Sequence, residues 1–291
     1  MFAATLRSDH LDEIAGLLPE TLQRAKGEAE LVFGTRAGLT VLRHLHQRTP
    51  CRILFPDTEP DEPKLAVLLT TSGGLTGGDE IRVSVAVEAG AMATVTTQAA
   101  EKLYRSLGPD TRIAINLAVA EGAWLEYLPQ ETILFEHSRL DRRTRVDVAT
   151  GGQFLACEML VFGRTAHHER LTRGRVFDRW QVWRDGRLLW SDAVLLENDI
   201  AAALAAPFGF DGAAAFATAL YVGQDAQDFL PLVRELTQRT SRGGASLVGD
   251  VLVARFLDAS ARVVRNDLGH YLAQLRQATG RRAALPRIWH S

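Results

Sequence analysis

The chain has 291 residues, of which 46% are hydrophobic and 23% charged, and its formal net charge at pH 7 is -2. This balance is typical of a folded globular protein, and it excludes both a disordered chain and the strongly basic surface of a nucleic-acid-binding protein. Its two cysteines, Cys51 and Cys157, stand far apart, which excludes a disulfide framework and a multi-cysteine metal site.

The N-terminal region does not have the composition of a secretory signal. Such a signal needs an uninterrupted apolar stretch, whereas residues 1–16 carry the charged side chains Arg7, Asp9, Asp12 and Glu13. The longest apolar tract, at 200–210, is interrupted by Pro207 and is shorter than the roughly 20 residues needed to cross a bilayer. We therefore expect a cytoplasmic protein with no membrane span.

From residue 65 to about residue 199, short apolar runs alternate with turn residues at spacings of about 8–12 residues, which is typical of an all-β sandwich, barrel or stack. Period-two alternation predicts strands at 81–87 and 113–119, and an apolar run predicts another at 123–128. The turn Arg184-Asp185-Gly186-Arg187 predicts a hairpin between 176–183 and 188–195, because Asp-Gly tolerates positive φ. We expect a β-meander in the middle of the chain.

The last third of the chain has a different texture. Residues 201–206 are rich in alanine, and the apolar spacing predicts helices at 225–238 and 260–278, the second ending at Gly280. A strand pair is expected between them, at 247–256. No linker rich in Pro or Ser precedes this part, so we expect helices from about residue 200 to pack on the β body.

The segment 70–79, with the sequence TTSGGLTGGD, contains four glycines. A phosphate-binding loop would end in Gly-Lys-Ser/Thr or open a helix, whereas here Asp79 follows the glycines and a strand comes next. Close approach of backbones between strands, or flexibility at a partner surface, explains the glycines better.

Two groups of histidines raise the question of a metal site. His44 and His46 are two residues apart, so on a strand both would face one side and could share an ion, but no further ligands occur at a matching spacing. His167 and His168 are adjacent and would point to opposite faces of a strand. Solvated or partly buried histidines are the favoured interpretation.

Several carboxylates gather in the middle of the chain: Glu126, Glu131, Glu136, Glu158 and Glu169. Glu158, on an apolar strand, or Glu169 could serve a small-molecule-binding β-barrel enzyme as acid or base. The favoured interpretation is pairing with the abundant arginines, such as Arg139, Arg142 and Arg164. Since no Gly-x-Ser-x-Gly elbow occurs, support for an enzyme is thin, and a structural interaction module without a metal role is the other alternative.

Five separated motifs then occur in order. They are GGLTGGD at 73–79, TTQAAEKLYRS at 96–106, EYLPQE at 126–131, FEHS at 135–138 and FGRTA at 162–166. Together they resemble the urease accessory protein UreD family, also called UreH. The match runs from about residue 22 to residue 192 and resumes at 286–289, so we expect one domain over 22–291 and a poorly matched, flexible N-terminus over 1–21.

The resemblance implies a non-enzymatic scaffold that is mainly β, with a stacked, helix-like arrangement of β-sheets and a few α-helices in the C-terminal third. It also implies a urease chaperone that acts with UreF and the GTPase UreG to insert nickel into apo-urease. These three proteins are the expected partners, with neither nucleic acid nor membrane among them. No tightly bound cofactor is expected, only transient contact with Ni2+.

A protein that passes a metal on should hold it weakly, because about 1.4 kcal/mol of extra affinity slows release about tenfold. Open sites lined by oxygen atoms are therefore expected, and an internal acidic path is predicted at Asp79, Glu131, Glu136 and Glu169. A polar and aromatic cluster predicted to dock a partner consists of Lys102, Tyr104 and Arg105. The C-terminal helices are a third candidate surface, for UreF.

One position departs from the family pattern. Near Arg164 that pattern usually reads Gly-Arg-x-Ala-x-Gly-Glu, and His168 stands where the last glycine is expected. If the position needs positive φ, His168 must adopt it or the turn must differ, and the role of Glu169 depends on the outcome.

Overall fold

The computed structural model describes residues 23–59, 62–164 and 167–290. The expectation for residues 1–21 lies outside this range, as do Thr165 and Ala166 of the fifth motif.

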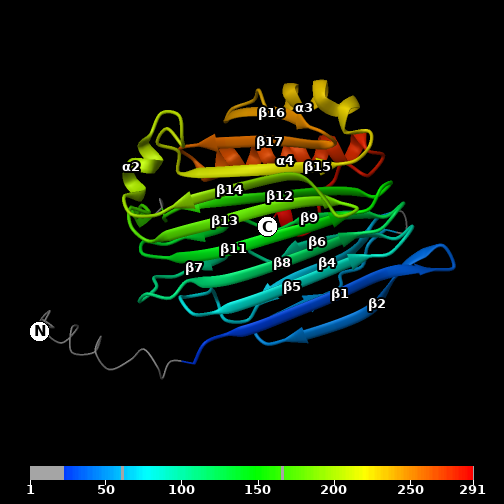
Figure 1. Cartoon of the computed structure of the whole chain (residues 1–291), viewed down its shortest axis with the longest axis horizontal. Helices are drawn as coiled ribbons and strands as arrows, with labels where there is room; N and C mark the ends of the chain where they lie inside the picture. The colour runs from blue at the N-terminus through cyan, green and yellow to red at the C-terminus, as the bar shows by residue number, and fades with distance from the viewer. Residues whose placement is uncertain (1–22, 60–61, 165–166, 291) are drawn as a thin grey trace, which may run out of the picture.

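Two β-sheets face each other along the whole molecule (Figure 1). Sheet A contains, in spatial order, β14 (Arg187–Leu196), β13 (Arg175–Arg184), β11 (Arg139–Val148), β8 (Thr111–Val119), β5 (Glu80–Val87), β1 (Lys26–Arg36) and β2 (Leu39–Arg48). Sheet B contains β16 (Arg242–Val248), β17 (Val251–Asp258), β15 (Ala215–Val222), β12 (Gln153–Phe162), β9 (Trp124–Leu128), β6 (Met92–Thr97), β4 (Lys64–Thr70) and β3 (Cys51–Leu54), with β7 (Glu101–Leu103) and β10 (Thr132–Leu134) beside β12.

Successive strands in the middle of the chain alternate between the two sheets. From β4 to β13 the chain crosses from one sheet to the other after each long strand, so β5, β8, β11 and β13 lie parallel in sheet A. The β-meander is therefore wrong, and the stacked, helix-like arrangement is confirmed. A period-two pattern shows that a strand has one buried face, but it does not show which strand lies beside it.

The hairpin at the end of this stack is confirmed. β13 and β14 pair antiparallel, and the turn residues Asp185 and Gly186 have φ of 48° and 80°. These positive angles are what a two-residue hairpin turn requires, and Asp-Gly adopts them at low cost.

The main core fills the space between the sheets. Alternate residues of β5 and β8 point into it, among them Val85 and Leu117, which are almost completely buried. Full burial of such a side chain contributes about 1.5–3 kcal/mol, so the inward faces of the parallel strands supply much of the stability.

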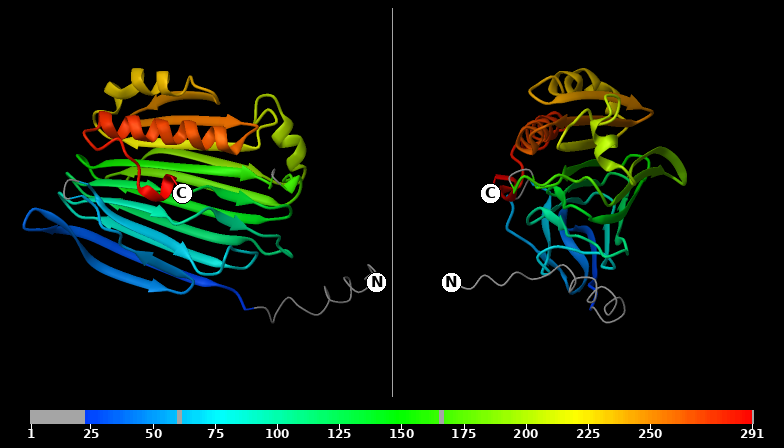
Figure 2. Two further views of the ribbon diagram at one scale, coloured as in Figure 1. Left: turned by 180° about the vertical axis from the view of Figure 1, so that it is seen from behind. Right: turned by 90° about the vertical axis from the view of Figure 1, so that its left-hand side faces the viewer.

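A second core lies on the outer face of sheet B, under the C-terminal helix. α4 (Ala261–Ala278) packs its buried stripe of Val264, Leu268, Leu272 and Leu275 against β15 and β17 (Figure 2). The helix begins after Ser260, and Gly280 with φ of 77° follows its end. This confirms the helix at 260–278. The strand pair before it is present, but it spans 242–258 (β16 and β17) and so begins five residues before the expected 247–256.

The other helices are short. α2 (Ile200–Ala205) occupies the alanine-rich segment, and the predicted helix at 225–238 consists of a 3-10 turn (Ala226–Phe229) and α3 (Leu230–Leu236). A further 3-10 turn lies at Arg287–His290. In the part of the chain that the structure describes, no helix has both the length and the apolar character needed to cross a membrane.

The two ends of the sheet stack differ. At one end the strands are joined by tight turns with glycines at positive φ, such as Gly90, Gly122 and Gly151. The other end, which we call the motif end, consists of the segments 71–79, 98–110 (with the short strand β7), 129–138 (with the short strand β10), 163–164 and 167–174. These loops carry most of the residues of the five motifs, and long loops on a rigid scaffold are where binding residues concentrate.

Candidate docking surface and internal cavity

The loops of the motif end stack on one another through backbone hydrogen bonds. Leu75 N donates to Lys102 O at 2.8 Å, Glu101 N to Glu131 O at 2.9 Å, and Gly163 N to Leu134 O at 2.8 Å. The stacked order of the strands therefore continues into the loops.

Two glycines of the first motif make this stacking possible. A Cβ on Gly74 would stand 2.8 Å from the carbonyl oxygen of Lys102, and one on Gly77 would overlap Ser106 Oγ and the carbonyl oxygen of Pro109. Close backbone approach, expected from the sequence, is thus confirmed at these two positions. A phosphate-binding role does not need to be invoked for them.

The three residues of the predicted docking cluster, Lys102, Tyr104 and Arg105, are all exposed. Tyr104 is 38% exposed, its hydroxyl donates to Gly73 O at 3.1 Å, and its ring meets Phe135 edge to face at 5.0 Å between centroids. Arg164 also contacts the Phe135 ring, with its Cζ 4.3 Å from the ring centroid. An aromatic ring held in place on a surface is the usual anchor of a protein interface.

The other two members of the predicted cluster are placed differently. Arg105 is exposed and pairs through its backbone with Ser138, while Lys102 is exposed as well and lines part of the cavity described below. Leu107, in the same loop as Tyr104, is 72% exposed and extends the apolar part of the surface. The structure therefore places all three residues at the surface of the motif end, with Lys102 also lining the cavity.

Two of the four predicted path carboxylates lie close together at this end. Glu169 contacts Arg164 at 2.5 Å and accepts a hydrogen bond from Glu136 N at 3.2 Å. The hydrogen bond from Arg164 lowers the pKa of Glu169 against the effect of burial. Burial also opposes ionisation of Glu136, but hydrogen bonds from Thr172 at 2.6 Å and from the Arg173 backbone lower its pKa.

The turn that carries Glu169 explains the departure from the family pattern. His168 has φ of 57°, so this position does take the left-handed conformation that a glycine would adopt most easily. Histidine therefore adopts the positive φ here, and Glu169, the next residue, pairs with Arg164.

The other two predicted path carboxylates lie apart from this pair. Asp79 is buried and accepts hydrogen bonds from Ala25 N and Thr76 N, both at 2.8 Å, which fixes the glycine-rich turn to the start of β1. Glu131 pairs with Arg265 of α4 at 2.5 Å and so faces the helix on the outside of sheet B. The structure therefore does not gather all four carboxylates along one line.

A cavity of about 280 Å³ lies between the two sheets and opens at the motif end, where the exposed residues Gly73, Gln98 and Ala99 line it. Its apolar walls come from β5 and β8, and its polar walls include Thr70, Glu101, Gln130 and Arg142. Glu101 accepts a hydrogen bond from Thr70 Oγ1 at 3.2 Å, and burial raises the pKa of Glu101 to about 7. The buried Gln130 Nε2 has no hydrogen-bond partner among the described residues.

Sequence reasoning missed Glu101 as a site residue, although the second motif contains it. Its direct neighbour across β7 and β10 is Thr132, so the same face of both strands looks into the cavity. The available signal was a glutamate directly after two alanines, at the start of the short segment Glu101-Lys102-Leu103.

Arg142, which lines the cavity, also belongs to a buried ionic cluster. Its guanidinium group contacts both carboxylate oxygens of Asp178 and lies 2.6 Å from Glu158 Oε2, which also accepts from Trp180 Nε1 at 2.7 Å. Burial raises the pKa of Glu158 to about 8, with Arg142 opposing and the charge of Asp178 adding to the shift. The favoured pairing with arginines is confirmed for Glu158 and Glu169.

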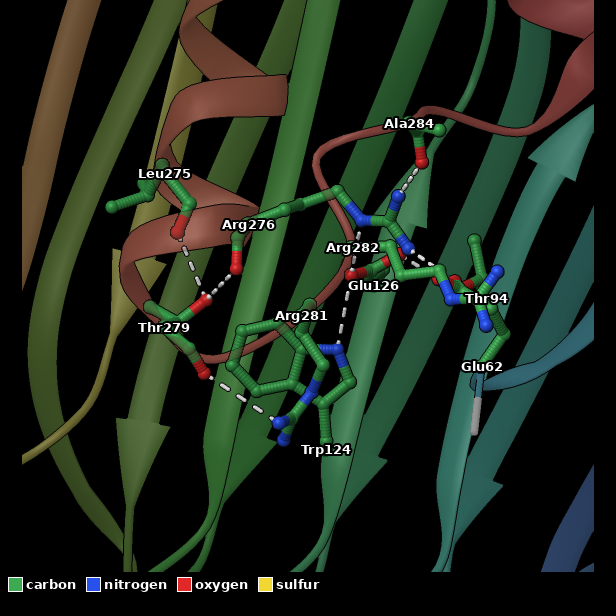
Figure 3. A network of polar contacts seen from close by, with 10 residues as sticks. All are labelled: Glu62, Thr94, Trp124, Glu126, Leu275, Arg276, Thr279, Arg281, Arg282 and Ala284. Atoms are coloured by element: carbon green, nitrogen blue, oxygen red, sulfur yellow. Dashed lines mark hydrogen bonds and ion pairs between the residues drawn. The ribbon is translucent and has the colours of Figure 1, made fainter. Parts of the chain in front are cut away.

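A second buried cluster fixes the C-terminal helix to sheet B (Figure 3). Arg276 Nε donates to Glu126 Oε1 at 2.8 Å, its Nη2 lies 2.9 Å from Glu62, and its Nη1 donates to the carbonyl oxygen of Ala284. Glu126 also accepts from Thr94 Oγ1 at 2.7 Å. One side chain thus joins α4, the C-terminal segment and the segment after β3.

Of the histidines singled out in the sequence, His44 and His46 lie on β2, on the outer face of sheet A, whereas His167 and His168 lie in the turn before Glu169 and not on a strand. His44 and His46 do face one side, and each stands near a different carboxylate, His44 at 3.7 Å from Glu30 and His46 at 3.6 Å from Glu28. Over the described ranges no group of three or more His, Cys, Asp or Glu side chains is found that could hold a metal ion. Cys51 and Cys157 are buried free thiols whose pKa burial raises.

Comparisons with known proteins support the resemblance. The family model described as UreD urease accessory protein matches residues 25–290. The chain is 41% identical over 273 residues to the urease accessory protein UreD of Magnetococcus marinus, covering 92% of this chain and 94% of that protein. It is 43% identical over 240 residues to UreD of Granulibacter bethesdensis (82% and 100% covered) and 40% identical over 292 residues to UreD of Rhodopseudomonas palustris strain BisA53 (98% and 99% covered).

Proposed function

Because this chain belongs to the UreD family of urease accessory proteins, we propose that it is a non-enzymatic assembly factor for the insertion of nickel into apo-urease in the cytoplasm. The single observation that carries the proposal is the family match over residues 25–290. UreF, UreG and apo-urease are the proposed partners. The motif end supports this role, because it offers an anchored aromatic ring and exposed loops for docking.

We further propose that nickel passes through the interior of this protein. The cavity between the sheets is polar on one side, and a single carboxylate, Glu101, lines it. A site of this kind binds a hydrated divalent ion weakly, which suits transfer better than storage. Glu136 and Glu169 at the motif end, and Asp79 and Glu131 farther apart, remain the other proposed carboxylates of the path.

A carboxylate-dependent enzyme is the second candidate. It is favoured by the cavity itself and by the raised pKa of Glu101 and Glu158, which such an enzyme would need. Against it, Glu158 is held by Arg142 and Trp180 and does not line the cavity. Assembly of a partner therefore explains the site better than chemistry on a small molecule.

The proposed function predicts that this chain restores urease activity. In cells that contain urease, UreF and UreG but lack their own UreD, its expression should raise urease activity at least tenfold in medium with nickel and leave it at background without nickel. The same strain without UreG is the control. Background activity despite normal accumulation of the folded chain would contradict the assignment and favour the second candidate.

The docking surface predicts a separate result. The double change Tyr104→Ala and Arg105→Glu should reduce recovery of the partner complex about tenfold or more, because an aromatic anchor typically contributes about 2 kcal/mol or more. Co-purification with a tagged partner measures the recovery. Leu188→Ala, which truncates a 42% exposed side chain on β14, is the matched control and should bind normally. Undiminished recovery of the double variant would remove the motif end as the docking surface.

A further inference from the structure

The motif end carries a group of exposed cations. They are Lys102, Arg105, Arg170 and Arg173, which we call the basic cluster. Within the described part of the chain, none of these four side chains forms an ion pair. Asp199 lines a depression together with Arg173, but its carboxylate accepts a hydrogen bond from the backbone of α2 and caps that helix instead.

The carboxylates that lie nearest along the chain are already neutralised by other arginines. Asp110 pairs with Arg139 at 2.8 Å and with Arg175 at 2.9 Å, and Glu169 pairs with Arg164 at 2.5 Å. The positive charge of the basic cluster is therefore not cancelled by its neighbours. Because the whole chain has a formal net charge of -2, this positive excess is a local feature of the motif end.

The segment that carries Arg170 and Arg173 is held in place from both sides. Leu171, between them, is buried, and Glu136 accepts hydrogen bonds from the backbone nitrogen and the hydroxyl group of Thr172, both at 2.6 Å. A fixed backbone therefore presents the two arginine side chains to solvent. A surface that is ordered before binding loses less conformational entropy when a partner docks.

The basic cluster extends across neighbouring loops. Ser106, next to Arg105, donates its N–H to His137 O at 3.0 Å, and His137 N donates to Arg173 O at 2.9 Å. Backbones paired in this way lie about 4.8 Å apart, so two such steps separate Arg105 from Arg173 by about 10 Å. That is about one Debye length at 0.1 M salt, so the charges of these loops act together on an approaching molecule.

Apolar side chains lie beside these charges. Tyr104, whose ring packs on Phe135, directly precedes Arg105, and Leu107 follows it with 72% of its surface exposed. Apolar anchors with charged residues around them are typical of protein–protein interfaces. An anionic membrane is typically bound by a basic amphipathic helix, and a nucleic acid by a wide basic face, whereas the basic cluster lies on short loops.

We propose that the basic cluster binds an acidic surface of a protein partner, with Tyr104 and Leu107 making the apolar contacts beside it. This inference rests on the proposed docking function of the motif end, and it adds the chemistry of the partner. Exposed charges at the rim of an interface act mainly on the rate of association, because they steer the approach of an oppositely charged surface. The aromatic contact acts mainly on the rate of dissociation.

The test is the association kinetics of the purified full-length chain with immobilised UreF, UreG and apo-urease, each alone and all three together. The partner of the motif end is the protein whose binding Tyr104→Ala with Arg105→Glu weakens. Arg170→Gln with Arg173→Gln should lower the association rate constant for that partner about fivefold or more in about 50 mM sodium chloride. In about 500 mM the difference from wild type should be less than about twofold, because salt screens the steering charges.

The matched control is Arg36→Gln with Arg187→Gln. It removes two positive charges from exposed arginines at the opposite end of the sheet stack and should bind like wild type at both salt concentrations. An equal fall in the association rate of Arg170→Gln with Arg173→Gln at both concentrations would assign these arginines a structural role and overturn the inference. Binding of vesicles that contain phosphatidylserine, lost in this variant while protein binding is unchanged, would overturn it in favour of a lipid surface.

The outcomes also separate this inference from the proposed function. If Tyr104→Ala with Arg105→Glu loses the complex but Arg170→Gln with Arg173→Gln associates like wild type in low salt, the docking surface stands and the acidic partner falls. If the wild-type chain binds none of the three proteins and does not restore urease activity, the proposed function falls and this inference falls with it.

Discussion

Replacing Arg276 with methionine is expected to lower the free energy of unfolding by about 3–5 kcal/mol, because the ionised Glu126 would stay buried without its partner. Both side chains are almost fully buried, at 1% and 0% exposure. The same change removes the contacts of Arg276 with Glu62 and with the carbonyl oxygen of Ala284. Urea unfolding at pH 7.5 measures the loss.

Two controls separate the buried charge from lost packing. The double variant Arg276→Met with Glu126→Gln should recover a large part of the loss, since a neutral side chain no longer needs an ionic partner. Arg143→Met, which breaks an exposed pair with Asp141, should leave the unfolding midpoint almost unchanged. A loss below about 1 kcal/mol for Arg276→Met would contradict a stabilising buried ion pair between Arg276 and Glu126.

The sequence predicted local elements well and their neighbours poorly. The strands at 81–87 and 113–119, the Asp185-Gly186 turn and the helix at 260–278 depend on periodicity and turn chemistry within a few residues, and all are present. Pairing of β5 with β8 depends on where the chain returns after visiting the other sheet. Local alternation contains no information on that return, so a meander and a stack produce the same pattern.

The candidate functional site was likewise predictable from the sequence only in part. The five motifs indicated the loops of the motif end. Tyr104 was predictable as a docking residue, because a tyrosine among polar residues can be recognised from the sequence alone. The pairing of Glu126 with Arg276 was not predictable, because Arg276 is 150 positions away along the chain. The importance of Glu101 depends on burial by β4 and β11, which only the folded sheets create.

Arg142 pairs with two buried carboxylates, so Arg142→Met is expected to lower the free energy of unfolding by about 3–5 kcal/mol at pH 8.5. Asp178 and Glu158 would then share a buried site without the guanidinium group. Two carboxylates so close cannot both be ionised at low cost, and a proton must be taken up on folding.

The sign of the pH dependence follows from that proton. In the wild type, the pKa of Glu158 is raised from 4.5 to about 8, so its contribution to stability is fully present below about pH 4.5 and is lost as pH rises through about 8. Without Arg142 the pKa of Glu158 should rise further, and the deficit of Arg142→Met should be smaller at pH 5.5 than at pH 8.5. Urea unfolding at both values measures it, with Arg142→Met combined with Asp178→Asn as the rescue variant. An equal deficit at both pH values would mean that Glu158 carries no proton in the interior.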